Sequence, residues 1–468
     1  MRKRFIISIA LLFAIGGVKA QYTKLLDFSG ANGNYPYGSL IYDGTYLYGM
    51  TNQGGSGNKG VVFRIKPDGT GDTVLLNFTG LNGRGPTGDL FYDGSYLYGM
   101  TAGGGTNNMG VVFQIKTDGT GYNNLLNFAG VANGANPYGS LFSDGVYLYG
   151  MTFVGGSSTG PLCGNGCGTI FKIMPNGIGY TKLLDFAGPN GSAPSYCALI
   201  SDGTYLYGTT GSGTGSALNG AVFKIKPDGS GDTVIYNCVY SNNGYNTNAS
   251  LFYDGTSLYG MTSLGGVADD GVIFRIMPNG SGYTKLLDFT GVANGSNPNG
   301  ALISDGIFLY GMTGSGGAGN TGTIFKIMPN GTGYTKMFGF TGTATGDQPL
   351  GSLMAIGSTF YGMTSTGGAN GMGVIFRYDN TLGISANEIN SEIRIFPNPS
   401  CGLIQITSGV NQITHIEVYN FLGENIFNSI KNNAPQTKID LSIQEPGIYF
   451  ISVETEKGTT VQKINIEH

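Results

Sequence analysis

The stretch that decides the fold is Tyr46-Leu47-Tyr48-Gly49-Met50-Thr51. Its tripeptide Leu-Tyr-Gly, with Phe in place of Leu in the last copy, stands at seven positions in the chain, separated by 50, 51, 58, 52, 51 and 51 residues. The glycines of these tripeptides are Gly49, Gly99, Gly150, Gly208, Gly260, Gly311 and Gly362. A long period that is kept over many copies is typical of repeat proteins, in which each copy is one supersecondary unit. The sequence therefore predicts a repeat domain of seven units.

Each unit contains four short apolar segments, which in the first unit are residues 38–42, 46–51, 61–65 and 72–78. They are rich in β-branched and aromatic residues and are bounded by Gly, Asp, Asn or Pro, a pattern that favours strands. Asp43-Gly44 and Pro67-Asp68-Gly69 are typical of hairpin turns, because glycine adopts positive φ without steric cost. We therefore expect an all-β fold in which every unit is one blade of a seven-bladed β-propeller.

The two ends of the repeat region complement each other. Tyr22–Phe28 has the sequence of a fourth strand but precedes every first strand, whereas the last unit, Gly351–Tyr378, has only three strands. An open solenoid would instead carry polar caps at its ends. This arrangement predicts that the N-terminal strand completes the seventh blade and closes the ring.

The chain begins with a basic segment, an apolar stretch from Phe5 to Val18 and small residues before Gln21, which together indicate a signal peptide. The apolar stretch is too short to span a bilayer, so a membrane anchor is the weaker alternative. We expect a signal peptide at 1–20, the propeller at 21–378, a linker at 379–392 and a small β-sandwich at 393–468. No membrane span is expected.

Composition excludes several classes of function. The chain has 84 glycines among 468 residues but 40% hydrophobic residues, so the glycines are expected in turns around a packed core. A net charge of −4 gives no basic surface for nucleic acid. Both histidines, His415 and His468, lie outside the propeller, which therefore has no histidine to activate a nucleophile or to hold a metal. We expect no catalytic activity and no cofactor.

The repeat resembles a known family. Residues 47–51 (Leu-Tyr-Gly-Met-Thr), the glycine-rich stretch after them and residues 60–65 (Gly-Val-Val-Phe-Arg-Ile) are similar to the tandem repeat called GloVer. That repeat occurs in exported bacterial proteins with assorted anchoring domains, and the resemblance covers roughly residues 22–378. It implies an exported protein and brings no assigned activity with it.

Residues 393–468 resemble the type A sorting domain of the type IX (Por) secretion system. The matching positions are Pro397, Asn398, Pro399, Gly402, the 418–420 strand followed by Leu422 and Gly423, Gly447, Tyr449 and Lys463. The resemblance implies a partner in the type IX secretion machinery and passage across the outer membrane. Removal of the domain and attachment to surface lipopolysaccharide usually follow, so we expect a protein at the cell surface or in the medium. A generic adhesive sandwich is the alternative.

Cysteine spacing predicts one disulfide. Cys163 and Cys167 enclose a short loop with two glycines, in a third unit that is longer than its neighbours, and export favours oxidation. Cys197 and Cys238 fall on the inner and outer strands of one blade, about 14 Å apart, which is too far for a disulfide. We expect these two and Cys401 to stay reduced.

Charged residues that recur around the ring suggest structural roles. The first hairpin carries an aspartate in six units, at Asp43, Asp93, Asp144, Asp202, Asp254 and Asp305. The third strand carries a basic residue in six units, at Arg64, Lys172, Lys224, Arg275, Lys326 and Arg377. Both hairpins emerge on one face, so we expect these basic residues to pair with the aspartates. An anion-binding collar is the alternative, in which Arg377 stands out because its blade has Ile356 in place of the aspartate.

Departures from the repeat indicate a binding site at the other face, where the inter-blade linkers and the loops between second and third strands meet. The residue before the first-strand leucine is Ser or Ala in six units but Asp89 in the second, and Arg84 is the one arginine in any inter-blade linker. Tyr37, Tyr138 and Tyr196 border the same channel mouth and offer stacking faces and hydroxyls. These five residues are the predicted ligand-binding set. In the simpler alternative, Arg84 and Asp89 only pair with each other.

The sequence thus favours an exported binding protein that recognises an unknown glycan or protein through the loop face of a propeller. The alternative is a polysaccharide-active enzyme, a glycosidase or lyase that uses carboxylates on that face. Such an enzyme would be expected to carry tryptophan platforms and non-repeating acids, and the chain has no tryptophan.

Overall fold

The computed structural model describes residues 21–158, 163–212, 219–238, 243–380, 393–398, 400, 402–409, 411–420, 425–455 and 458–467. The chain divides into two compact units on either side of Asn380–Thr381. The predicted signal peptide and most of the predicted linker lie outside the described residues.

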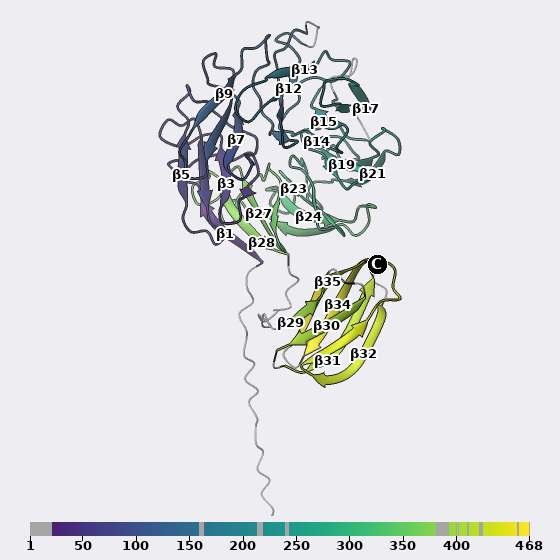
Figure 1. The fold of residues 1–468 in the computed structure, drawn as a ribbon. Helices are drawn as coiled ribbons and strands as arrows, with labels where there is room; N and C mark the ends of the chain where they lie inside the picture. Colours follow the sequence, from purple (N-terminus) through teal and green to yellow (C-terminus); the bar gives the residue numbers. More distant parts are fainter. Residues whose placement is uncertain are drawn as a thin grey trace, which may run out of the picture. The chain divides into compact units, whose positions relative to one another are not determined.

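Seven four-stranded antiparallel sheets form the blades of the propeller, arranged in a ring (Figure 1). The innermost strands are β2 (Ile41–Tyr42), β6 (Phe91–Tyr92), β10 (Phe142–Ser143), β14 (Ile200–Ser201), β18 (Phe252–Tyr253), β22 (Ile303–Ser304) and β26 (Met354–Ile356). The second strands are β3 (Leu47–Thr51), β7 (Tyr96–Thr101), β11 (Leu148–Thr152), β15 (Leu206–Thr210), β19 (Leu258–Thr262), β23 (Leu309–Thr313) and β27 (Thr359–Thr364). The third strands are β4 (Val61–Ile65), β8 (Val111–Lys116), β12 (Thr169–Ile173), β16 (Ala221–Ile225), β20 (Val272–Ile276), β24 (Thr323–Ile327) and β28 (Val374–Asp379). The outermost strands are β5 (Thr73–Asn77), β9 (Asn123–Asn127), β13 (Thr181–Asp185), β17 (Thr233–Asn237), β21 (Thr284–Asp288), β25 (Thr335–Gly339) and β1 (Tyr22–Asp27).

The second strand of every blade is the most buried. All five residues of β3 are buried, because neighbouring blades cover both faces of the sheet. Gly49 pairs with Phe63 of β4, and a Cβ on that glycine would overlap the phenylalanine ring. The hexapeptide pattern therefore keeps its glycine because an aromatic side chain of the next strand lies directly on it.

The ring closes as predicted, with the N-terminal strand in the seventh blade. β1 pairs with β28 in an antiparallel register that runs from Tyr22 opposite Tyr378 to Asp27 opposite Val374. Tyr22 also stacks on Phe338 of the sixth blade, with ring centroids 4.4 Å apart. The N-terminal strand thus joins its own blade and packs against the preceding blade.

The expected pairing between third-strand basic residues and turn aspartates is wrong. Asp43 accepts the N–H groups of Thr45 and Tyr46 and the hydroxyl of Tyr48, so its oxygens are filled by its own hairpin. Arg64 donates instead to the Thr117 carbonyl of the next blade at 3.0 Å and stacks over the Tyr46 ring. Lys172 and Lys224 likewise donate to a backbone carbonyl of the next blade, so these side chains join neighbouring blades while they lie over an aromatic ring of their own blade.

The C-terminal unit is a sandwich of two antiparallel sheets. One sheet contains β29 (Ile393–Phe396), β30 (Leu403–Ser408) and β33 (Gln436–Asp440) in that order. The other has the order β32 (Asn425–Ala434), β31 (Ile413–Asn420), β34 (Gly447–Thr455) and β35 (Gly458–Ile466). Buried aliphatic residues of both sheets form one core. None of the described residues forms a helix long and apolar enough to cross a membrane.

Part of the predicted sorting motif is visible in this unit. Asn398 accepts the Asn465 N–H at 2.9 Å, and the Tyr449 hydroxyl donates to the Glu445 carbonyl at 2.8 Å. Gly402 has a φ of +104° and lies so close to Ser442 that a side chain would collide with its backbone. Pro399, Gly423 and the Lys463 side chain lie outside the described residues.

Candidate binding site at the channel mouth

A pocket of about 170 Å³ lies on the axis of the propeller. Its lining comes from residues just before the innermost strands, and six of the seven blades contribute. The lining side chains with polar groups include Tyr37, Asp89, Tyr196, Ser250, Asn299 and Ser352. Because these residues directly follow the inter-blade linkers, the pocket lies at the linker face of the channel, the face on which the sequence analysis placed its candidate ligand-binding residues.

Hydrogen bonds join the blades around this pocket. At five of the seven junctions between blades, the residue before the first-strand leucine donates its N–H to the side chain at the same position of the next blade, and we call this arrangement the amide belt. Its five bonds are Ser39 to Asp89 Oδ1 (2.5 Å), Asp89 to Ser140 Oγ (2.7 Å), Ala198 to Ser250 Oγ (2.7 Å), Ala301 to Ser352 Oγ (2.8 Å) and Ser352 to Ser39 Oγ (2.8 Å). The belt stops at the two junctions where the next blade has an alanine, Ala198 or Ala301.

Close backbone packing narrows the channel beside the belt. A Cβ on Gly38 would collide with the Gly88 carbonyl of the next blade, and Gly351 meets Gly38 in the same way. The fourth and fifth blades have Cys197 and Ala249 in place of this glycine. Cys197 is buried, and its thiol donates to the Thr209 carbonyl at 3.3 Å. The ring of close glycine contacts is therefore interrupted on the side of the channel next to Tyr196.

Asp89 is the one charged residue among those that line the pocket. Its side chain is partly accessible from the cavity, yet protein surrounds it closely. Burial raises the pKa of the Asp89 carboxyl group, although hydrogen bonds from Ser39 and Ser140 act in the opposite direction. The carboxylate is thus held by neutral donors in a poorly hydrated position.

The ion pair between Arg84 and Asp89 that stood as the alternative is not formed, and Arg84, which belongs to the predicted ligand-binding set, does not line the pocket. The Arg84 N–H is bonded to the Gly103 carbonyl at 2.8 Å, and its exposed side chain lies over that glycine. This backbone contact holds Arg84 against the loop after β7, whereas Asp89 is held at the channel axis by the belt. Arg84 and Asp89 are five positions apart in the sequence, which suggested a pair. The course of the linker, which separates the two side chains, could not be read from the sequence.

Two of the three predicted tyrosines line the pocket. Tyr37 and Tyr196 do so directly. Tyr138 stacks on Tyr196 with ring centroids 5.6 Å apart and packs edge-on against Phe153. Burial, together with the nearby Tyr138 and Tyr37, raises the pKa of Tyr196. The structure therefore brings Tyr37, Asp89 and Tyr196 together, with Tyr138 behind Tyr196.

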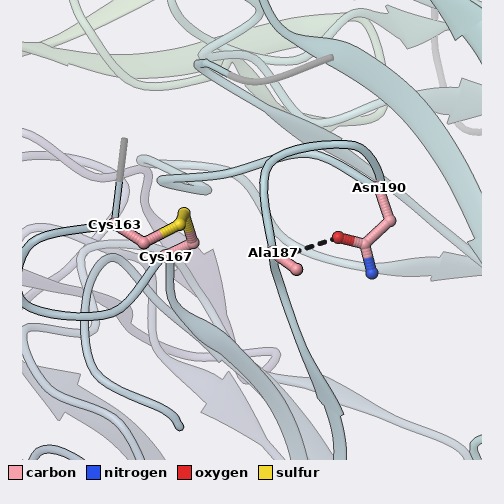
Figure 2. Close-up of a disulfide and its surroundings, with 4 residues drawn as sticks. All are labelled: Cys163, Cys167, Ala187 and Asn190. Carbon is pink, nitrogen blue, oxygen red and sulfur yellow. Dashed lines mark hydrogen bonds between the residues drawn. A yellow bond between two sulfur atoms is a disulfide. The ribbon is translucent and has the colours of Figure 1, made fainter. Parts of the chain in front are cut away.

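The predicted disulfide between Cys163 and Cys167 is present in the loop between β11 and β12 (Figure 2). Both cysteines are buried, and the Cys167 carbonyl accepts the Ala193 N–H at 2.9 Å. Ala193 belongs to the linker that carries Tyr196, and Figure 2 shows the turn of the same linker, closed by Asn190 accepting the Ala187 N–H. The disulfide loop thus supports the backbone that positions Tyr196.

The two other cysteines that the structure describes form no disulfide, and the described residues form no metal site. Cys197 and Cys238 are free and buried, as expected, and Cys401 lies outside the described residues. In the part of the chain that the structure describes, no three His, Cys, Asp or Glu side chains lie close enough to hold a metal ion. The pocket offers a carboxylate, hydroxyls, an amide and tyrosine rings, which suits recognition of a polar ligand by hydrogen bonds and stacking.

Sequence reasoning missed Ser250, Asn299 and Ser352, which also line the pocket. The alternation of Ser and Ala before the first-strand leucine was visible, but its role as an acceptor for the preceding blade was not. The signal that could have found these residues is their shared repeat position with Asp89 or Tyr37, because equivalent positions of a closed ring face the same axis.

Comparisons with known proteins agree with this architecture. The model of the Gloeobacter/Verrucomicrobia repeat matches residues 10–162 and 214–389, and that of the secretion system C-terminal sorting domain matches residues 394–467. No curated protein matches the chain.

Solved structures with similar folds include an oligogalacturonate lyase in complex with manganese, at 13% identity and a TM-score of 0.50, with 76% of this chain and 92% of that chain covered. Another is the extracellular domain of a one-component system from B. thetaiotaomicron, at 13% identity and a TM-score of 0.51, with 95% of this chain and 52% of that chain covered. This chain spans about half the length of that extracellular domain. At such identities the likeness concerns the fold alone. The chain belongs to the Gloeobacter/Verrucomicrobia repeat family, and its secretion system C-terminal sorting domain directs it across the outer membrane to the surface or the medium.

Proposed function

We propose that the propeller is a carbohydrate-binding module that takes a sugar into the channel-mouth pocket. The observation that carries this proposal is the convergence of tyrosine rings with neutral hydrogen-bonding side chains in one small cavity. Sugars present both apolar ring faces and hydroxyls, so they are recognised by aromatic stacking combined with a few directed hydrogen bonds. Tyr37 and Tyr196 supply the aromatic area, and Ser250, Asn299 and Ser352 supply neutral donors and acceptors.

Binding is a better account of the pocket than catalysis. Most glycosidases use a pair of carboxylic acids that flank the scissile bond. Among the described residues that line the pocket, Asp89 is the one carboxylic acid. A glycosidase or lyase would therefore need a second acid or base from outside this lining. The similar lyase supports a shared fold, not a shared activity.

A glycan array probed with the exported protein, beside a hydrolysis assay on the same glycans, tests this proposal. We expect binding without release of shortened sugars. Tyr196→Asn should weaken binding by about tenfold, because stacking on one aromatic ring contributes about 1 kcal/mol or more. Asparagine already occupies the equivalent position in two other blades, as Asn248 and Asn299, so the substitution suits the fold.

The matched control is Tyr92→Ser, since Ser143, Ser201 and Ser304 stand at that position in other blades and Tyr92 does not line the pocket. This variant should bind as the wild type does. Release of shortened sugars would favour the enzyme, and retention of a protein partner without any glycan would favour a protein-binding surface.

A further inference from the structure

The charge of the pocket is not balanced within the protein. Asp89 forms no ion pair with any lysine or arginine among the described residues, and Arg84 lies over Gly103 instead. The groups that reach the Asp89 carboxyl group are the Ser39 N–H and the serine side chains on either side. Hydrogen bonds from neutral donors lower the cost of a buried carboxylate but leave its charge uncompensated.

The amide belt contains one acidic acceptor. Ala301 donates to Ser352, Ser352 to Ser39, and Ser39 to Asp89, and the Asp89 N–H donates onward to Ser140, so Asp89 is the one carboxylate in a run of neutral hydroxyl acceptors. The Ser39 and Ser140 hydroxyls accept backbone N–H groups, which leaves their own hydrogens free to point at Asp89. These neutral donors hold the carboxylate in place without neutralising its charge, so it can still pair with a cationic group of a ligand.

The tyrosines of the pocket favour the same kind of partner. Tyr37 and Tyr196 line the cavity together with Asp89, and aromatic rings attract cations through the negative charge of their faces. An anionic ligand such as a uronate would meet a carboxylate without any protein cation to offset the repulsion. A positively charged ligand group would instead gain both an ion pair and contact with aromatic rings.

One backbone N–H group beside the pocket lacks a hydrogen-bond acceptor in the part of the chain that the structure describes. The Ser250 N–H has no acceptor among the described residues, because Ala301 of the next blade lacks the side-chain oxygen that continues the belt elsewhere. Ser250 lines the pocket, as do the amide of Asn299 and the hydroxyl of Ser352. A sugar hydroxyl supplies both an acceptor and a donor, whereas the alkyl chain of a lysine supplies neither.

We propose that the sugar bound in this pocket carries a free, positively charged amine, as a glucosamine residue does, and that the amine pairs with Asp89. The proposal rests on the carbohydrate-binding function and specifies its ligand class. The amine supplies the missing charge at Asp89, while ring hydroxyls reach the Ser250 N–H and its neighbours.

Calorimetric titration of the full-length exported protein with two matched oligosaccharides tests the proposal. The probes are the tetramer of glucosamine and the tetramer of N-acetylglucosamine, which share a backbone but differ in charge. At near-neutral pH we expect the wild type to bind the amine tetramer roughly tenfold more tightly or better, as for a charged hydrogen bond. Asp89→Asn keeps the shape of the side chain and should reduce this preference to about twofold or less.

The matched control is Asp68→Asn, which also removes one negative charge but lies in a hairpin where other blades have Asn176, Asn279 and Asn330. It should retain the wild-type preference. Equal affinity of the wild type for both tetramers would overturn the proposal and leave carbohydrate binding intact. A preference that survives Asp89→Asn would also overturn it, as would tighter binding of a tetralysine peptide than of the amine tetramer. Failure to bind any glycan would contradict the proposed function itself.

Discussion

At the scale of single residues, Asp89 has two roles with opposite effects on the stability of the fold. As a belt member it accepts the Ser39 N–H, and a serine accepts the equivalent N–H at the four other junctions of the belt. As a buried acid it costs stability when ionised, because burial raises the pKa of its carboxyl group above the ordinary value. Serine could accept the same hydrogen bond without this cost in stability. A binding role therefore explains the acid at this position, whereas a structural role does not.

Asp89→Ser should therefore raise thermal stability at neutral pH. A raised pKa in the folded state means that the protonated acid stabilises the fold at low pH and that this contribution is lost as the pH rises through the folded pKa. The advantage of the variant should thus be largest at neutral pH and should vanish below about pH 4, where the unfolded acid is also protonated. Melting curves over this pH range check the prediction. The prediction would be contradicted if the variant melted at a lower temperature than the wild type at neutral pH, or if its advantage over the wild type were larger at low pH than at neutral pH.

The residues that sequence reasoning found share one property. Asp89, Tyr37 and Tyr196 all stand at repeat positions where blades differ, and such positions distinguish one side of a ring from another. Arg84 also breaks the pattern, but its side chain lies on the loop surface, and a repeat alignment does not show the direction of a side chain in a linker. The belt could not be predicted because its bonds join residues about fifty positions apart in different blades.

At the scale of structural elements, the loop between β11 and β12 is the clearest departure from the repeat. The family model leaves residues 163–213 unmatched, a segment that contains the disulfide, the linker of the fourth blade and Tyr196. Phe153 from the same loop packs on Tyr138, which in turn stacks on Tyr196. The least repetitive part of the propeller therefore builds one wall of the pocket.

Removing this disulfide should affect binding more than its modest contribution to stability suggests. Cys163→Ser with Cys167→Ser should lower the free energy of unfolding by about 2 kcal/mol at most, because the closed loop is very short. Binding at Tyr196 should weaken further, because the loop that accepts the Ala193 N–H loses its constraint. Denaturant titration and glycan titration of the double variant measure the two effects. Reductant should reproduce both effects in the wild type and change nothing in the variant; unchanged affinity in both cases would show that the loop does not position Tyr196.

At the scale of the whole molecule, the architecture could be predicted almost completely from the sequence. Strand segments that are bounded by glycine-containing turns and repeat with a nearly constant period predict both the blade and the number of blades. The displaced Tyr22–Phe28 segment predicts how the ring closes. The contacts between blades could not be predicted in the same way. Each hairpin aspartate satisfies its own turn and the tyrosine five residues on, so the basic residues are free to bind the next blade. Local hydrogen bonds take precedence here because they need no further ordering of the chain.

Ring closure by β1 gives the last prediction. Deleting residues 21–28 removes the partner of β28, exposes its backbone edge and uncovers Phe63, Phe338 and Phe376, which pack against Phe28 or Tyr22 of the missing segment. An unpaired edge beside exposed aromatic rings should lower the melting temperature and promote aggregation. A permuted chain supplies the matched control, with residues 21–28 moved to follow Asn380 through a copy of hairpin 66–71, so that the seventh blade gains its fourth strand in the order used by the other blades. The Asp379 N–H already bonds to the Gln21 carbonyl at 2.8 Å, which places the two ends of that new hairpin side by side. Melting curves and light scattering should show the permuted chain close to the wild type and the deletion variant well below both. Equal melting temperatures for the deletion variant and the wild type would mean that the ring is held by the contacts between blades without this strand.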